Sequence, residues 1–223
     1  MNADHAKFEA IIFDMDGTLT SEGSSWVFVH DHFGKSDAAR KNLEAYLADN
    51  ISYREFMRLD ISLWPPQLPI SEIETILHPI GVSSGAPELI QFLSPRLKCL
   101  VLSAGIDLLT ERVAQELGIT KWVANGLQVD GSRRLTGEGI ERCALNGKVT
   151  AADSLLQDEK VEWNQCVVVG DSKFDRDLLH YVRLNGGLSV SVGMDPKLRE
   201  TAMLRVPDLV TLLGVISKLQ FDS

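Results

Sequence analysis

Short apolar runs alternate with amphipathic segments along most of this chain. The runs are too short for helices and are rich in branched apolar side chains, which is typical of buried strands. They cover residues 10–13, 97–102, 166–169 and 188–192. Helical spacing of apolar residues follows them over about 87–93, 107–117, 148–157, 175–182 and 209–219. This alternation predicts a doubly wound α/β fold, a mostly parallel sheet with helices on both faces.

One long segment, from Ser25 to Leu77, interrupts the alternation. It has no strand pattern, and its apolar residues keep helical spacing throughout. Ser71 and Glu74 have the spacing of a capping box, which predicts a helix start there. The chain is therefore expected to divide into a core of residues 1–20 and 84–223 and a helical insert of residues 21–83.

A second and smaller insert is predicted between residues 122 and 139, where residues alternate as in strands. Asp130-Gly131 supplies the turn chemistry of a tight β-hairpin. Arg133 and Arg134 fall in the loop of this hairpin and are expected to be solvated.

Composition limits the compartment and the partners. The 223 residues are 44% hydrophobic and 24% charged, which fits one main domain with an insert. No apolar run approaches the roughly 20 residues of a membrane span, and residues 1–5 lack the features of a signal peptide. We therefore expect a cytoplasmic protein without a membrane partner. The net charge of −9 argues against nucleic acid as a partner, while the oligomeric state is left open.

Three cysteines, Cys99, Cys143 and Cys166, are widely spaced and odd in number. Cys99 and Cys166 stand in apolar, strand-like surroundings. The pattern favours reduced thiols that serve in packing over a disulfide framework.

Polar side chains follow three of the predicted strands. They are Asp14 and Asp16, then Ser103 with the backbone amides of Ala104 and Gly105, and finally Asp171. In a doubly wound sheet the carboxyl ends of the strands meet at one crevice, where ligands bind. Lys148, near the start of a predicted helix, can enter the same crevice.

This set of residues suits a phosphate ester. Mg²⁺ prefers oxygen ligands from a few carboxylates, water and phosphate, and Asp14 and Asp171 can supply the carboxylates. Lys148, a hydroxyl and backbone amides can hold the other phosphate oxygens. Asp14 is placed to attack phosphorus and form an aspartyl phosphate, which water then cleaves. Asp16, two residues on, can protonate the leaving alcohol and later take a proton from water.

The chain resembles the haloacid dehalogenase superfamily, and within it the phosphoserine-phosphatase-like branch. Four ordered stretches carry the resemblance: Asp14-Met15-Asp16-Gly17-Thr18, Ser103-Ala104-Gly105, Lys148, and Gly170-Asp171-Ser172-Lys173-Phe174-Asp175. The helical insert is similar to the cap of that branch, and residues 124–137 are similar to its hairpin. The resemblance implies a Rossmann-like core and a Mg²⁺-dependent phosphatase for a small phosphorylated metabolite.

The resemblance also implies a role for each residue of these stretches. Asp14 is the nucleophile, Asp16 the acid and base, and Lys148 a catalytic and phosphate-binding residue. Asp14, the Asp16 main-chain carbonyl and Asp171 hold the metal, and Asp175 supports its shell. Thr18 orients Asp16 and is grouped with Ser103, Ala104, Gly105 and Lys148 as substrate-binding or phosphate-binding residues.

The resemblance weakens where phosphoserine phosphatases grip the amino and carboxyl groups of their substrate. Those enzymes use an acid shortly after the first motif and an arginine in the cap. Here Gly23 falls at the expected acid, with Glu22 one position early, and Asp60 falls at the expected arginine. Phe174 stands where a polar residue is common. A carboxylate at position 60 would repel a substrate carboxylate, so the substrate stays open.

Several aromatic and apolar side chains of the insert allow two interpretations. Trp26, Phe28, Met57 and Trp64 either line a substrate pocket or form the core of the insert, as aromatics at helical spacing usually do. His30 and His32 are two residues apart on a predicted helix, so they point to different faces and do not form a metal pair.

Two alternative functions remain open at this point. A phosphotransferase or mutase would use the same phosphoaspartate and pass the phosphate to another alcohol. A signalling receiver domain also gathers acids, a hydroxyl and a lysine around a phosphorylated aspartate. The helical insert and Asp16 argue against the receiver, because a receiver needs no lid and a built-in acid and base would shorten its signal.

Overall fold

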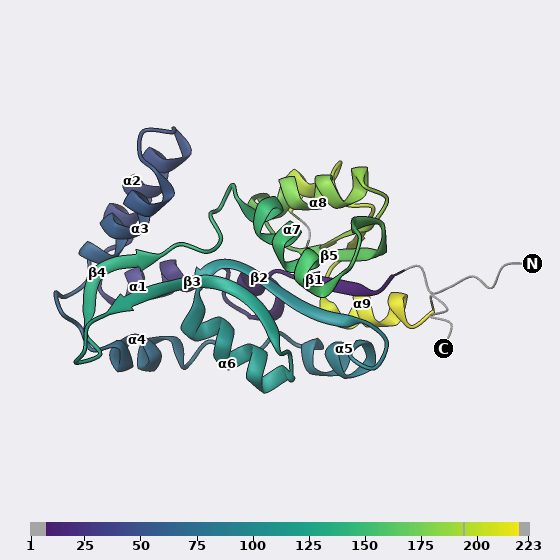
Figure 1. Ribbon diagram of the computed structural model, residues 1–223, viewed down its shortest axis with the longest axis horizontal. Coiled ribbons are helices and arrows are strands. Elements are labelled where there is room, and N and C mark those ends of the chain that lie inside the picture. The colour runs from purple at the N-terminus through teal and green to yellow at the C-terminus, as the bar shows by residue number, and fades with distance from the viewer. Residues whose placement is uncertain (1–7, 194, 219–223) are drawn as a thin grey trace, which may run out of the picture.

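A seven-stranded sheet runs through the computed structural model, which describes residues 8–193 and 195–218 (Figure 1). The strands are β1 Ala10–Phe13, β2 Lys98–Ile106, β3 Lys121–Val129, β4 Leu135–Ile140, β5 Cys166–Gly170, β6 Leu188–Val192 and β7 Leu204–Val206. Their order is β4-β3-β2-β1-β5-β6-β7. Every neighbouring pair is parallel except β3 and β4, so the predicted α/β fold with a hairpin is confirmed.

Helices cover both faces of the sheet (Figure 1). They are α5 Ala86–Leu93, α6 Asp107–Leu117, α7 Lys148–Glu159, α8 Arg176–Leu184 and α9 Leu209–Ile216. Ile11 and Phe13 of β1 belong to the hydrophobic core that includes α5, α6 and α9. Ala10 and Ile12 belong to the second core, with α7 and α8. Because both faces of β1 are covered, its sequence is apolar without alternation.

Four helices form the insert between β1 and α5. They are α1 Ser25–His32, α2 Ser36–Leu47, α3 Tyr53–Ser62 and α4 Ile70–Leu77. The two chain segments that enter and leave the insert pair with each other, through an antiparallel bridge between Thr20 and Val82. Ser83 N also donates to Leu19 O at 2.8 Å. The helices occupy the place expected for a cap. The division of the chain into a core of residues 1–20 and 84–223 and a cap of residues 21–83 stays a prediction.

The hairpin joins the core sheet to this insert. The first part of β3 pairs in parallel with β2, and its later part pairs in antiparallel fashion with β4. β4 packs against α3, where Met57 lies over Gly139. Asp130 Oδ1 accepts hydrogen bonds from Ser132 N and Arg134 N at 2.8 and 3.0 Å, which closes the predicted turn.

The helix start expected from Ser71 and Glu74 is wrong. Helix α4 begins at Ile70 after Pro69, and no side chain caps it. The Ile70 amide donates instead to Arg133 O of the hairpin loop, so a tertiary contact fixes this start.

Strand β7 was not predicted, because three residues carry too little pattern. The predicted end of the last helix, Leu219, lies outside the described residues.

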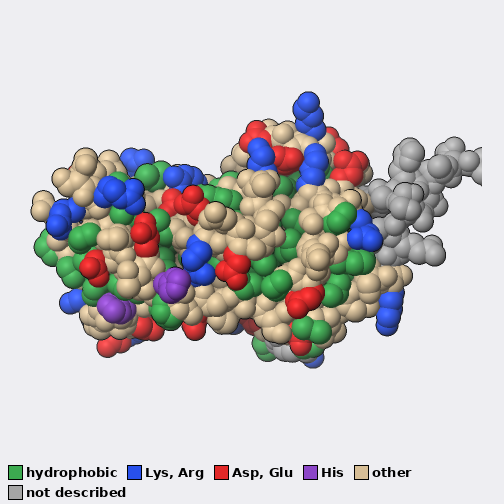
Figure 2. All heavy atoms as spheres, turned by 90° about the horizontal axis from the view of Figure 1, so that it is seen from below, with side chains coloured by type: hydrophobic (Ala, Val, Ile, Leu, Met, Phe, Trp, Pro, Cys, Tyr) green, Lys and Arg blue, Asp and Glu red, His purple; other side chains and the backbone are tan. Residues whose placement is uncertain are grey.

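The surface charges and the state of the cysteines agree with the expectations drawn from the composition. The face seen in Figure 2 intersperses acidic side chains with lysine and arginine. No helix in the described part of the chain is long and apolar enough to cross a membrane. Cys99, Cys143 and Cys166 are unpaired, and burial raises the pKa of each thiol to about 12, as expected of packing residues.

Gly85 offers a test of the packing between α5 and α9. Its φ is +83°, and an added Cβ would lie 2.8 Å from Val210 N. We expect Gly85→Ala to lower the free energy of unfolding by about 2 kcal/mol or more in urea titrations. Gly214→Ala, on an open face of α9, is the control and should raise it by about 0.5–1 kcal/mol. Equal stabilities for the two variants would contradict this account.

Candidate active site

A sharp turn after β1 positions the first acid of the site. The Asp14 amide donates to Val169 O of β5 at 2.9 Å, which fixes Asp14 at the carboxyl ends of the two central strands. Gly17, in the turn, has a φ of +85°, and an added Cβ would lie 2.6 Å from Asp171 Oδ2. Glycine is therefore required for the turn to approach the acid that follows β5.

A buried lysine links two of the acids. Lys148 Nζ, at the start of α7, lies 2.6 Å from Asp14 Oδ1 and 2.6 Å from Asp175 Oδ1. Burial lowers the pKa of Lys148, but the two carboxylates outweigh it and hold that pKa well above its usual range. Lys148 is therefore a cation in this site.

The second oxygen of Asp175 organises the loop after β5. Oδ2 accepts hydrogen bonds from Asp171 N at 3.2 Å and from Ser172 N at 3.0 Å. Asp175 and Ser172 form a capping box around the short 3₁₀ helix Lys173–Asp175, which precedes α8. Asp175 thus holds the loop that carries Asp171, which fits the predicted supporting position.

Three carboxylates gather closely enough to share a cation. Asp14, Asp171 and Asp175 each offer an oxygen within 4.8 Å of the others. Burial and the charge of Asp175 raise the pKa of Asp171 to about 6, and the same two causes raise the pKa of Asp14 well above its usual value. Crowded carboxylate oxygens of this kind fit Mg²⁺, whose charge would relieve their repulsion.

Asp16 has a different environment from these three acids. Its Oδ2 accepts hydrogen bonds from Ser25 N at 3.0 Å and Ser25 Oγ at 2.8 Å. Its Oδ1 is buried without a hydrogen-bond partner among the described residues. Burial raises the pKa of Asp16. One oxygen is thus fixed and the other is left for a ligand.

The structure gives Thr18 a different partner from the one expected. Thr18 Oγ1 donates to Asp171 Oδ1 at 2.8 Å, and Ser25 takes the predicted place of Thr18 in orienting Asp16. Sequence reasoning missed Ser25. The only signal for it was the pair Ser24-Ser25 before an apolar helical pattern, which indicates a helix start and not a contact with Asp16.

The stretch after β2 is more tightly bonded than predicted. Ser103 Oγ accepts a hydrogen bond from Gly105 N at 2.9 Å, so the Gly105 amide is not free in this structure. An added Cβ at Gly105 would lie 2.6 Å from Ser25 Oγ and would also overlap Asp16 Oδ2. Gly105 thus allows the first helix of the insert to reach Asp16.

The Ala104 carbonyl joins the insert and the hairpin to the core. It accepts hydrogen bonds from Trp26 Nε1 at 3.2 Å, Tyr53 Oη at 3.2 Å and Asn125 Nδ2 at 2.9 Å. Trp26 comes from α1, Tyr53 from α3 and Asn125 from β3. Neither Tyr53 nor Asn125 was singled out from the sequence, because nothing local indicates a contact this distant.

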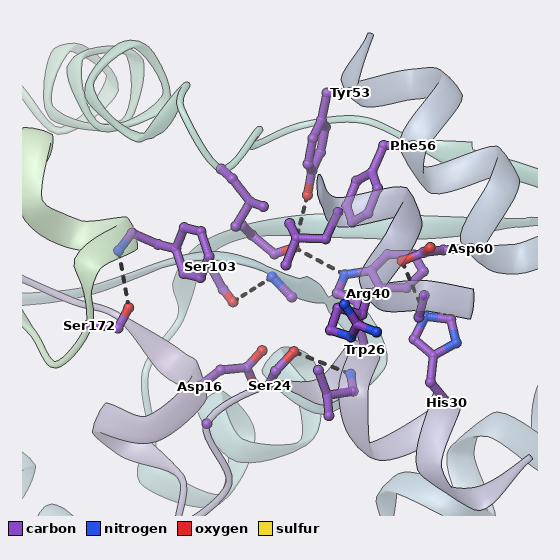
Figure 3. A pocket seen from close by; sticks show the side chains of 18 of the residues that line it. Asp16, Ser24, Trp26, His30, Arg40, Tyr53, Phe56, Asp60, Ser103 and Ser172 are labelled. Atoms are coloured by element: carbon purple, nitrogen blue, oxygen red, sulfur yellow. Dashed lines mark hydrogen bonds and ion pairs between the residues drawn. The ribbon is translucent and has the colours of Figure 1, made fainter. Parts of the chain in front are cut away.

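A cavity of about 390 Å³ lies between the insert and the core. Figure 3 shows Asp16 and Ser103 on one side of it and His30 and Asp60 on the other. The cavity brings together Asp14, Asp16, Ser103, Ala104, Gly105 and Lys148 from the motifs. Its other walls are largely apolar side chains of the insert.

The expected pocket aromatics divide between two roles. Trp26 lines the cavity, together with Gly23 and Phe174. Phe28, Met57 and Trp64 are not among its walls; Met57 packs on Gly139, and Trp64 stacks on Trp26 with 5.6 Å between ring centroids.

Acids, a lysine and a hydroxyl thus meet at the carboxyl edge of a doubly wound sheet, under a helical insert. This is the place where α/β enzymes bind their substrates. The chain belongs to the haloacid dehalogenase-like hydrolase family, whose model matches residues 11–180. The match confirms the superfamily and the hydrolase class expected from the motifs.

Known proteins similar to this chain include several named phosphoserine phosphatase. The one from Archaeoglobus fulgidus is 26% identical over 92% of this chain, which spans only 59% of that relative's length. The one from Polaromonas sp. is 28% identical, over 89% of this chain and 85% of its own length. A solved structure of a phospho-aspartyl intermediate analogue of phosphoserine phosphatase is 25% identical, with a TM-score of 0.76 over 94% of this chain and 99% of its own. These likenesses place the chain in the predicted branch.

The crowding of the carboxylates predicts a pH-dependent stability. The pKa of Asp171, about 6 in the fold, lies above its unfolded value of about 3.9, so the ionised side chain destabilises the fold above pH 6. In EDTA at pH 8, Asp171→Asn should raise the free energy of unfolding by on the order of 2 kcal/mol. The gain should vanish towards pH 4, where the wild-type side chain is protonated.

Urea titrations at pH 4 and pH 8 measure this gain. Asp158→Asn, on the exposed face of α7, is the control and should change stability little at either pH. An equal gain for Asp171→Asn at both pH values would show that charge repulsion is not its cause.

Proposed function

We propose that this protein is a Mg²⁺-dependent phosphatase that hydrolyses a small phosphate monoester through an aspartyl phosphate on Asp14. The observation that carries the proposal is the contact of Lys148 with Asp14 at the wall of a cavity that Asp16 also lines. The relatives named phosphoserine phosphatase support the same chemistry.

Asp14 is the nucleophile. One of its oxygens attacks phosphorus, the new O–P bond forms, and the bond from phosphorus to the ester oxygen breaks. Burial and Asp175 disfavour the charged carboxylate, whereas Lys148 favours it. The lysine also balances the negative charge of the phosphoryl oxygens.

Asp16 moves the protons. Its raised pKa favours the protonated carboxyl, which donates to the leaving alcohol oxygen. The resulting carboxylate then takes a proton from the water that cleaves the aspartyl phosphate. Because Ser25 holds Oδ2, Oδ1 is the atom placed to exchange the proton.

The metal and phosphate sites follow the same geometry. Asp14, Asp171 and the main-chain carbonyl of Asp16 would hold Mg²⁺, with Asp175 fixing the loop beneath. When bound, the ion neutralises charge on the phosphate and orients it. The rest of the phosphate site in this proposal is formed by Lys148, Ser103, Thr18 and the backbone at Ala104 and Gly105. In this structure Thr18 donates a hydrogen bond to Asp171, and the Gly105 amide donates one to Ser103, so both donors would have to exchange these partners for the phosphate.

The size of the cavity, about 390 Å³, suits a small phosphorylated metabolite. We expect this metabolite to be a cytoplasmic one. Location, and the expected lack of nucleic-acid and membrane partners, stay predictions. A phosphotransferase or mutase would share every step up to the aspartyl phosphate. A receiver is less favoured, because Asp16 beside the cavity promotes turnover and not storage of the phosphoryl group.

Phosphate release from a panel of small esters tests the proposal. We expect turnover with Mg²⁺, its loss in EDTA, and a fall of at least about 10³-fold for Asp14→Asn, because the amide is a poor nucleophile. An added acceptor alcohol distinguishes a transferase, which would form a new ester. Turnover by well-folded Asp14→Asn at the wild-type rate would contradict the mechanism.

Ser25→Ala tests the positioning of Asp16. Asp16 Oδ2 loses the shorter of its two hydrogen bonds and keeps only the one from the Ser25 amide, so kcat should fall about 10–100-fold with a smaller change in KM. The Ile106 amide also loses its acceptor, Ser25 Oγ at 2.9 Å, which should cost about 1–3 kcal/mol of stability.

Ser24→Ala is the matched control. It removes the cap of α1, a bond from Val27 N to Ser24 Oγ at 3.2 Å, and should cost about 1 kcal/mol of stability. If both variants lower kcat to the same extent, the effect belongs to the helix and not to Asp16.

A further inference from the structure

A series of buried polar side chains that contact one another in the insert has no part in the phosphoryl chemistry above. Trp64 Nε1 donates to His30 Nδ1 at 3.1 Å, and His30 Nε2 lies 3.1 Å from Asp60 Oδ2. Asn42 Nδ2 donates to the other oxygen of Asp60 at 2.8 Å. His30 and Asp60 are 1% and 2% exposed, yet both line the cavity (Figure 3). Asp60 therefore presents a buried carboxylate to the ligand space.

The partners of this carboxylate are neutral. His30 accepts a hydrogen bond at Nδ1, so its imidazole is uncharged and keeps its hydrogen on Nε2. Nε2 is close to Asp60 but is not aligned for a hydrogen bond. Among the described residues, no lysine or arginine lies within ion-pair distance of Asp60. Arg40, which also lines the cavity, pairs instead with Asp37 and Glu44.

A carboxylate buried with only neutral partners is costly, and a cation beside it would remove that cost. The surrounding walls suit a cation as well. Trp26, Tyr53 and Phe56 line the same cavity (Figure 3), and aromatic faces attract ammonium groups. A polyol would need many polar partners, which these largely apolar walls do not offer.

We propose that the insert binds the ammonium group of an amino-alcohol phosphate, with Asp60 and the aromatic side chains as its site. The inference rests on the proposed phosphatase function and names the class of its substrate. The alcohol carries a primary or quaternary amine and no carboxylate, because a carboxylate would meet Asp60. The phosphate end lies at Lys148 and the ammonium end at Asp60.

Paired substrates test the charge without changing the shape. Choline phosphate and 3,3-dimethylbutyl phosphate differ in one atom, a cationic nitrogen against a neutral carbon. We expect kcat/KM with Mg²⁺ to favour choline phosphate by about tenfold or more. Ethanolamine phosphate should likewise exceed phosphoserine, which adds only a carboxylate.

Asp60→Asn should bring the ratio of kcat/KM for choline phosphate to kcat/KM for 3,3-dimethylbutyl phosphate close to one. Glu55→Gln is the matched control, because it removes one negative charge from the same helix. Glu55 does not line the cavity, and its Oε1 lies 2.6 Å from a guanidinium nitrogen of Arg58. The Glu55→Gln variant should keep the preference. If Asp60→Asn fails to fold, calorimetry on the wild type compares choline with 3,3-dimethylbutanol, and tighter binding of choline is expected.

The outcomes separate the two proposals. Turnover of p-nitrophenyl phosphate with an equal rate on both esters of the first pair would overturn the ammonium site and leave the phosphatase standing. Failure to hydrolyse any ester, with no release that depends on Mg²⁺, would overturn the phosphatase itself. A preference for phosphoserine over ethanolamine phosphate would show that a substrate carboxylate is accepted near Asp60 and would overturn the substrate class.

Discussion

The contact of one buried lysine with two buried carboxylates determines the arrangement of this site. Lys148 connects Asp14, at the end of β1, to Asp175, at the start of α8, and so joins three elements that are distant in sequence. Without the lysine charge, acids this close and this deeply buried would repel one another with little screening by solvent. A single lysine offsets only part of their charge. The negative charge that remains suits a divalent cation, and the charge of that cation would in turn favour a phosphate.

The same contrast between compensated and uncompensated charge extends to the insert. The acids of the core have a lysine beside them, whereas Asp60 has an amide and a neutral imidazole. The two ends of the cavity therefore differ in the charge that they would favour: under the proposals above, the core end would take a metal ion with an anion, and the insert end a cation. Such a cavity would orient a substrate that carries both charges before any chemistry begins.

Sequence reasoning predicted the parts of the site that belong to strand ends. Asp14 and Asp171 could be placed because parallel strands end at the same edge of a sheet, and the apolar run before each was clear. It failed where a side chain depends on a distant backbone. Ser25 reads locally as a helix start and yet holds Asp16, and α4 starts where the hairpin loop allows it. Asp60 could be located on a helix, but its neutral partners come from other elements of the insert.

Strand β3 belongs both to the core sheet and to the hairpin that packs on α3. The insert is therefore tied to the core at three points, the paired segments around Thr20 and Val82 being the other two. An insert held only by its two connecting segments could rotate widely, whereas the additional contact of α3 with the hairpin restricts how far this insert can move from the core. Any movement that widens the cavity would therefore have to carry the hairpin along with the insert, and so would be felt in the core sheet itself.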